Sequence, residues 1–116
     1  MLDQKNCQSC PSDTSPLDTQ AINKYLAGLD NWQLHHDRNK IYCEYTFKNF
    51  IDALEFVNKV GAICEKENHH PDINFGWGFC QIIFYSHNIK GLHENDFIMA
   101  AKTTQLFNKM SGQQRN

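Results

Sequence analysis

Three histidines stand where the chain passes from one predicted element of secondary structure to the next. His69 and His70 are consecutive and precede Pro71, which ends a helical pattern and forces an extended backbone. His87 directly follows a strand-like segment. An imidazole has an ordinary pKa of about 6.5, so several imidazoles in one pocket suit proton transfer at neutral pH. The alternative is that the first two cap a helix and His87 is an ordinary loop residue.

Hydrophobic periodicity predicts the elements that position these histidines. Apolar residues recur at helical spacing in three segments and alternate with polar residues in four others. The order helix, two strands, helix, two strands, helix predicts an α+β fold, with a four-stranded antiparallel sheet and helices on one face. The predicted helices span about 17–29, 50–67 and 97–110, and the predicted strands about 32–34, 41–47, 73–78 and 80–86.

Pairing of the last two strands would bring the histidines together. If these strands form a hairpin joined near residues 76–79, the chain at Pro71 and the chain at His87 return side by side. Residues 17–110 are then one domain. Residues 1–16 contain almost nothing apolar and are predicted to be a disordered N-terminal tail, and residues 111–116 a C-terminal tail.

The composition argues against several classes of partner. The chain has 116 residues, of which 41% are hydrophobic, and a formal net charge of −2 with scattered lysines and arginines. Binding to nucleic acid is therefore not expected. No apolar run approaches the ~20 residues that span a bilayer, so we expect a cytoplasmic protein without a membrane segment. Cys43, Cys64 and Cys80 fall in apolar or strand-like segments, as reduced thiols of a reducing compartment would.

The motifs, taken in order, resemble the pterin-4a-carbinolamine dehydratase family. The resemblance covers about residues 17–107 and omits only the two ends of the chain. It is carried by Glu65-Lys66, Asn68-His69-His70-Pro71-Asp72, Ser86-His87, Gly91-Leu92 and Asp96, with Trp32 and Phe47-Lys48-Asn49-Phe50 in addition.

This resemblance implies a lyase that needs no metal and no organic cofactor. Its substrate would be 4a-hydroxytetrahydrobiopterin, which an aromatic amino acid hydroxylase leaves behind, and its product quinonoid dihydrobiopterin. The role implied is tetrahydrobiopterin recycling. The family's catalytic histidines correspond to His69, His70 and His87, and its substrate-binding residues to Asn68, Tyr85, Ser86, Asn88 and Asp96.

Loss of the 4a-hydroxyl requires an acid at the leaving oxygen and a base at the ring N5 proton. We predict that His70 is the acid. His87 or His69 would take the base and orienting roles, with the carboxylate of Asp96 favouring a charged imidazole beside it.

Two positions depart from the family pattern. Gly78 stands at the hairpin where the family usually has a polar residue, often Asn, and His93 stands before the last helix where it has Ser or Thr. Loss of a Ser or Thr cap would cost about 1 kcal/mol, unless Asn95 or another residue caps that helix.

Two further groups have the residue types of metal or redox sites. Cys7 and Cys10 form a C-x-x-C pair, but no second pair follows, and the surrounding segment predicts an exposed tail. His35 and His36 are adjacent in a predicted hairpin loop, where a solvated turn is the simpler interpretation.

A different class of function is a protein-binding module. Some relatives of this family serve as dimerisation cofactors of transcription factors, and an exposed apolar face would suit that role. The sheet face that no helix covers also predicts a homo-oligomer, either a dimer or a tetramer.

Overall fold

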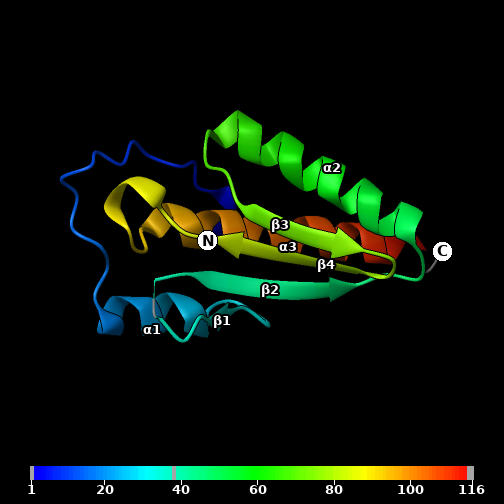
Figure 1. Cartoon of the computed structure of the whole chain (residues 1–116), viewed down its shortest axis with the longest axis horizontal. Coiled ribbons are helices and arrows are strands. Elements are labelled where there is room, and N and C mark those ends of the chain that lie inside the picture. The colour runs from blue at the N-terminus through cyan, green and yellow to red at the C-terminus, as the bar shows by residue number, and fades with distance from the viewer. Residues whose placement is uncertain (1, 38, 115–116) are drawn as a thin grey trace.

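The computed structural model describes residues 2–37 and 39–114, and its centre is one four-stranded antiparallel sheet (Figure 1). The strand order is β1-β2-β4-β3, with β2 and β4 in the middle. These two pair from Ile41 opposite Phe84 to Thr46 opposite Phe79. The strands are β1 (Gln33–Leu34), β2 (Ile41–Thr46), β3 (Asp72–Gly76) and β4 (Phe79–Phe84).

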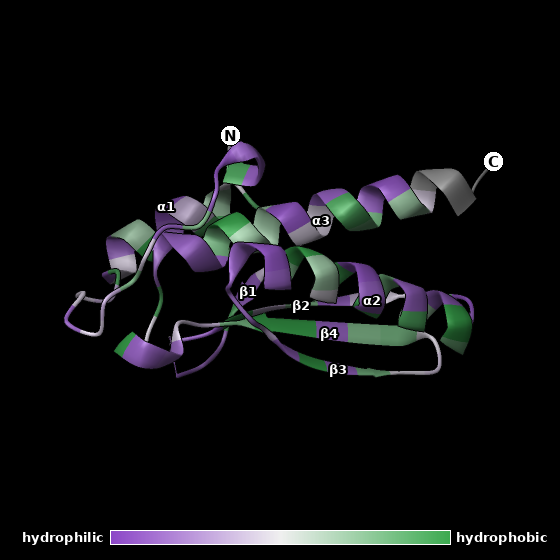
Figure 2. Ribbon diagram, turned by 90° about the horizontal axis from the view of Figure 1, so that it is seen from above, coloured by the Kyte–Doolittle hydropathy of each residue, from purple (hydrophilic) through white to green (hydrophobic). Residues whose placement is uncertain are grey.

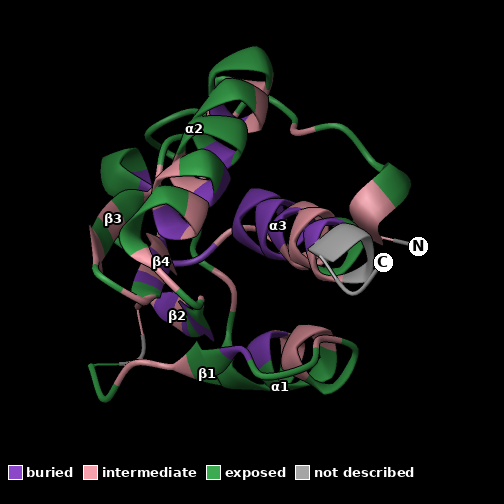
Figure 3. Cartoon of the chain, turned by 90° about the vertical axis from the view of Figure 1, so that its right-hand side faces the viewer, coloured by how far each residue is buried: buried purple, intermediate pink, exposed green. Residues whose placement is uncertain are grey.

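The α-helices lie on one face of this sheet, which confirms the predicted α+β architecture (Figure 3). Helix α2 lies over β3 and β4, α3 lies beside it, and α1 lies near β1. No helix of the described residues covers the other face. The helices are α1 (Thr19–Ala27), α2 (Phe50–Glu67) and α3 (Glu94–Gln114), and two short 3-10 helices are η1 (Leu2–Gln4) and η2 (His87–Ile89).

The core forms between the covered sheet face and the helices. Successive strand residues point to opposite faces, so every second residue of β2 and β4 is buried. Most of β4 is coloured hydrophobic in Figure 2. Burial of each large apolar side chain contributes about 1.5–3 kcal/mol to the free energy of unfolding. The buried set includes Ile41, Cys43 and Tyr45 of β2, Cys80, Ile82 and Phe84 of β4, and Ala53, Phe56, Val60 and Cys64 of α2.

The N-terminal segment runs against the domain rather than away from it. Figure 1 shows it passing the η2 loop before it reaches α1. Lys102 Nζ donates to the Asp3 carbonyl at 3.0 Å, and the Leu17 amide donates to the Leu92 carbonyl at 2.8 Å. The prediction that residues 1–16 are disordered in solution stays a prediction.

The last helix is longer than the sequence pattern indicated. It begins at Glu94 and continues to Gln114, past residue 110, and residues 115–116 of the predicted C-terminal tail lie outside the described residues. None of the described helices has both the length and the apolar character needed to cross a bilayer.

The β3–β4 hairpin has the two-residue loop Trp77-Gly78, because Gly76 pairs with Phe79. Gly78 has φ +82°, which lies in the left-handed region. A Cβ atom there would lie 3.3 Å from the Phe47 carbonyl oxygen. The Phe47 amide donates to the Gly78 carbonyl at 2.8 Å, so the loop also fixes the start of α2.

Substitutions at Gly78 should distinguish the cost of a positive φ from the cost of a Cβ contact with the Phe47 carbonyl oxygen. Both Gly78→Ala and Gly78→Asn add the same Cβ, but Asn tolerates positive φ better than Ala. We expect Gly78→Ala to lower the free energy of unfolding by about 1–2 kcal/mol and Gly78→Asn to lower it less. Urea unfolding of the three proteins measures this difference. Equal losses for Ala and Asn would show that the Cβ contact, not φ, limits this position.

Candidate histidine pocket

The end of α2, the end of β4 with η2, and the start of α3 surround one pocket of about 550 Å³, hereafter the histidine pocket. These three regions meet because β3 and β4 form the predicted hairpin, which returns the chain from Pro71 to His87. The pocket is lined by Cys7, Gln8, Ser9, Cys10, Glu67, Asn68, His69, His70, Ser86, His87, Asn88 and Asn95.

The C-terminus of α2 turns sharply to present the two adjacent histidines. Asn68 has left-handed φ and ψ of 55° and 41°, a conformation that Asn adopts more readily than most residues. The Asn68 amide donates to the Glu65 carbonyl at 3.2 Å, and the His69 amide donates to the Cys64 carbonyl at 3.1 Å. This pair of bonds is a Schellman motif, so Asn68 directs His69 into the pocket through the backbone.

A buried carboxylate holds His69 in place. Asp96 has no solvent exposure, and its Oδ1 lies 2.6 Å from His69 Nε2. An ionised carboxylate only accepts hydrogen bonds, so Nε2 of His69 carries the proton. In the neutral ring the lone pair then lies on Nδ1, which has no hydrogen-bonding partner among the residues that the structure describes. The His69 ring also lies nearly parallel to Phe84, with centroids 6.1 Å apart.

The second oxygen of Asp96 joins two further elements. Ser86 Oγ donates to Oδ2 at 2.8 Å, and the His93 amide donates to Oδ2 at 2.9 Å. Ser86 is itself buried. The carboxylate is therefore satisfied by donors from α2, from the end of β4 and from the start of α3, as a buried charge requires.

The expected loss of a helix cap at His93 is not observed. The His93 ring Nδ1 accepts from the Asn95 amide at 3.0 Å, so this imidazole replaces the Ser or Thr hydroxyl. Asp96 returns a bond to the His93 amide, which completes a capping box. The Asn95 side chain, which we considered as the substitute cap, bonds the N-terminal segment instead.

The other two histidines are more exposed than His69. His70 Nε2 lies 2.7 Å from Glu65 Oε1, and both side chains are largely exposed. The exposed His87 packs its ring against Tyr85, with centroids 3.9 Å apart. Lys40 Nζ also lies over the Tyr85 ring, 4.9 Å from its centroid. His70 and His87 therefore have access to solvent, whereas the ring of His69 is held by its hydrogen bond to buried Asp96.

The structure brings most of the predicted site residues together. Asn68, His69, His70, Ser86, His87 and Asn88 all line the histidine pocket. Tyr85 supports His87 from beside the pocket. Because Asp96 is fully buried, it contacts His69 and not the pocket space, so its geometry is that of a positioning residue.

Sequence reasoning missed Glu67, Asn95 and the segment 7–10, which also line the pocket. No periodic pattern pointed to them. The C-x-x-C spacing singled out Cys7 and Cys10, but we interpreted it as an exposed tail. Both thiols are half-buried, and burial raises the pKa of Cys7 to about 12, with a further contribution from Glu67.

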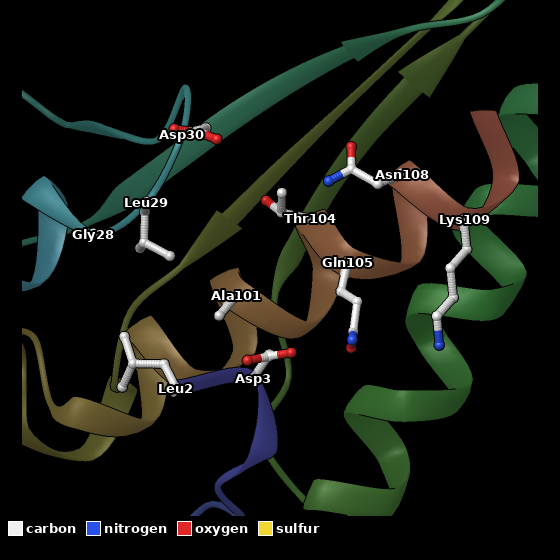
Figure 4. A pocket seen from close by; sticks show the side chains of 10 residues that line it. All are labelled: Leu2, Asp3, Gly28, Leu29, Asp30, Ala101, Thr104, Gln105, Asn108 and Lys109. Carbon is white, nitrogen blue, oxygen red and sulfur yellow. The ribbon is translucent and has the colours of Figure 1, made fainter. Parts of the chain in front are cut away.

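A larger hollow lies elsewhere, between η1, the loop after α1 and the outer side of α3 (Figure 4). Its volume is about 620 Å³. None of its ten lining residues is a histidine or a cysteine, so it lacks a group suited to proton transfer at neutral pH. The chemistry favours the smaller histidine pocket.

The second histidine pair lies apart from this pocket. His35 follows β1, and its ring packs at a tilt against His36 with centroids 4.2 Å apart. The Nδ1 atom of His35 lies 3.1 Å from Asp37 Oδ1. Among the described residues, no group of three or more His, Cys, Asp or Glu has an arrangement that could hold a metal ion.

Fold and site together define a small α+β protein with a pocket lined by three histidines at the open end of a β-hairpin. Residues 15–106 match a sequence model of the family described as pterin 4 alpha carbinolamine dehydratase. A Methylococcus capsulatus protein that carries the family's name is 46% identical over 105 residues, which cover 90% of this chain and 92% of that protein. A Rickettsia canadensis protein of the same name is 46% identical over 103 residues, which cover 88% and 94%.

Two solved structures share the fold. A transcriptional coactivator/pterin dehydratase from Brucella melitensis matches with a TM-score of 0.76 and 28% identity, over 79% of this chain and 98% of that chain. A pterin dehydratase-like protein, identified as a RuBisCO assembly factor in the alpha-carboxysome, matches with a TM-score of 0.57 and 21% identity, over 66% and 88%. This second likeness shows the fold alone. The chain belongs to the pterin-4a-carbinolamine dehydratase family, as its motifs predicted.

Substitution of Asp96 should destabilise the whole pocket. In Asp96→Asn one of the two side-chain atoms becomes a donor and faces groups that already donate. We expect a loss of about 1.5–3 kcal/mol in the free energy of unfolding, and about 0.5–1.5 kcal/mol for Ser86→Ala, which removes one of the three bonds. Urea unfolding measures both. A smaller loss for Asp96→Asn than for Ser86→Ala would contradict this central role.

Proposed function

We propose that this protein dehydrates 4a-hydroxytetrahydrobiopterin to quinonoid dihydrobiopterin, as a hydro-lyase acting in tetrahydrobiopterin recycling after an aromatic amino acid hydroxylase. The observation that carries the proposal is the hydrogen bond between buried Asp96 and His69, because His69 lines the same pocket as His70 and His87. A carboxylate behind an imidazole fixes its tautomer and its orientation, which general acid–base catalysis requires.

The reaction needs one proton delivered and one removed. The C4a–O bond breaks as the hydroxyl takes a proton and leaves as water. The N5–H bond gives its proton to a base, and its electrons form the C4a=N5 double bond. The two catalytic groups must therefore reach neighbouring atoms of one bicyclic ring, which consecutive residues at a helix terminus can do.

The hydrogen bonds favour His69 as the base and His70 as the acid. With its Nε2 proton held by Asp96, neutral His69 offers the Nδ1 lone pair to the N5 proton. His70 lies beside Glu65 and is exposed, so its ring can regain a proton from water after each turnover. His87, braced by Tyr85, takes the orienting role.

The decisive measurement is the rate of quinonoid dihydrobiopterin formation from freshly generated 4a-hydroxytetrahydrobiopterin. We expect the wild-type chain to accelerate it, and His69→Ala/His70→Ala to lose roughly 10²–10⁴-fold in kcat, the usual contribution of general acid–base groups. The single variants test the roles: intact turnover in His70→Ala with loss in His69→Ala would exclude His70 as the acid.

The chain offers its own matched control. His35 and His36 are also consecutive, but they lie in the β1–β2 connection and line no part of the histidine pocket. The variant His35→Ala/His36→Ala should therefore keep the wild-type rate. No acceleration by the wild-type chain would refute the dehydratase proposal.

We also infer that the protein associates through an apolar surface at the far end of the sheet, hereafter the hairpin surface. Phe50, Ile51, Trp77 and Phe79 are exposed, and Trp77 retains 72% of its accessible area. Phe50 and Ile51 begin α2, and Trp77 and Phe79 lie at the β3–β4 turn. The Phe50 ring stacks on Phe75 of β3, with centroids 5.6 Å apart, so the start of α2 lies against the end of β3 that leads into this turn. Exposed apolar clusters of this kind mark protein contacts. A second copy is the proposed occupant; another protein, in a cofactor role, is the alternative.

Charge placed on the hairpin surface should disrupt this association. We expect sedimentation equilibrium to give two or four times the 13.5 kDa chain mass for the wild-type protein. Ile51→Glu/Trp77→Glu should shift it towards one chain mass, because burying two carboxylates in an apolar contact is unfavourable. Asn58→Glu, on the exposed side of α2, is the control. A wild-type monomer would exclude the homo-oligomer.

A further inference from the structure

Four consecutive residues of the N-terminal segment line the histidine pocket, although the sequence pattern predicted a tail there. They are Cys7, Gln8, Ser9 and Cys10, hereafter the N-terminal strap. Three pocket residues from three different regions bind the backbone of the strap: Glu67 at the end of α2, Asn88 in η2 and Asn95 at the start of α3.

Asn95 makes the most specific of these contacts. Its Oδ1 accepts from the Gln8 amide at 2.9 Å, and its Nδ2 donates to the Gln8 carbonyl at 2.7 Å. One side chain therefore satisfies both backbone groups of one residue, much as a neighbouring β-strand would. Asn95 is only 3% exposed, so its side chain has little freedom to adopt another orientation.

The two ends of the strap are held as well. The Cys7 amide donates to Glu67 Oε1 at 2.8 Å, and the Cys10 carbonyl accepts from Asn88 Nδ2. The Cys7 side chain packs against the hydrophobic core, and its Sγ lies 3.9 Å from the Asn95 carbonyl. Cys7 thus acts as an apolar anchor. These contacts order the strap at the pocket wall, on elements that also carry the histidines.

We propose that the N-terminal strap is a wall of the substrate site that sets the affinity for the pterin, with Asn95 as its positioning residue. This inference rests on the proposed function. The histidines act at C4a and N5, so the strap would contact the remainder of the bicyclic ring or its C6 substituent. Contacts away from the reacting atoms bind the ground state and the transition state alike, so they act on KM and not on kcat.

Two full-length variants loosen the strap from opposite sides. Asn95→Ala removes both hydrogen bonds to Gln8, and Gln8→Pro removes the amide donor without altering α3. We expect each variant to raise KM for 4a-hydroxytetrahydrobiopterin roughly five- to ten-fold, which is the effect of losing one or two hydrogen bonds. We expect kcat to stay within about two-fold of wild type. An unchanged KM in both folded variants would overturn the proposal, as would a loss confined to kcat.

Lys5→Ala is the matched control. It removes a contact between the same N-terminal segment and α3, the 2.9 Å ion pair with Glu94, and Lys5 and Glu94 lie outside the pocket lining. We expect its KM to stay within about two-fold of wild type, because exposed ion pairs contribute little. A rise in KM equal to that of Asn95→Ala would show that the strap contacts have no special role.

A second measurement does not depend on turnover. Cys10 is half-buried in the pocket lining, whereas Cys43, Cys64 and Cys80 are buried in the core. Saturating 7,8-dihydrobiopterin should slow alkylation of Cys10 by iodoacetamide at least about five-fold, measured by peptide mass spectrometry, because a bound ring covers the thiol. Unslowed alkylation at saturation would overturn the strap proposal. Absence of turnover in the wild-type chain would refute only the proposed function, since the alkylation result stands by itself.

Discussion

Asp96 is a carboxylate without solvent exposure, and such a group is tolerated only where hydrogen bonds replace the water it has lost. Its donors come from the end of α2, the end of β4 and the start of α3, through His69, Ser86 and the His93 amide. The ends of these three elements must therefore meet at one point. The orientation of His69, the cap of α3 and the shape of the pocket all depend on this meeting.

The hydrophobic core supplies the rigid frame on which that meeting depends. Packing of α2 and α3 against β2 and β4 fixes where the helix termini lie, and the hairpin of β3 and β4 fixes where the chain returns. Polar bonds at Asp96 then select one arrangement of the termini. The energy of folding thus comes mainly from apolar burial, while the precision of the site comes from a small number of buried polar bonds.

The N-terminal segment shows how a polar sequence can contribute to a site. Its backbone groups bind side chains that the folded domain already presents, so it needs little apolar surface of its own. His93 is a second example, because its ring nitrogen caps α3 where a hydroxyl was expected. In both places a side chain satisfies a backbone polar group, and the residue type alone did not predict that contact.

The sequence by itself determined the fold class, the element order and the set of histidines, because periodicity and the Asn68-His69-His70-Pro71 run are local properties of the chain. Only the tertiary structure decided that Asp96 is buried behind His69, that His93 caps α3 and that Asn95 holds Gln8. The Asp96–His69 and Asn95–Gln8 contacts join residues far apart in the chain, and local patterns carry no information about which distant polar atoms will meet. The His93 cap is local, but it depends on the orientation that the imidazole adopts in the folded chain. Burial of Asp96 depends on the packing of several elements at once, so it follows from the assembled core and not from any one segment.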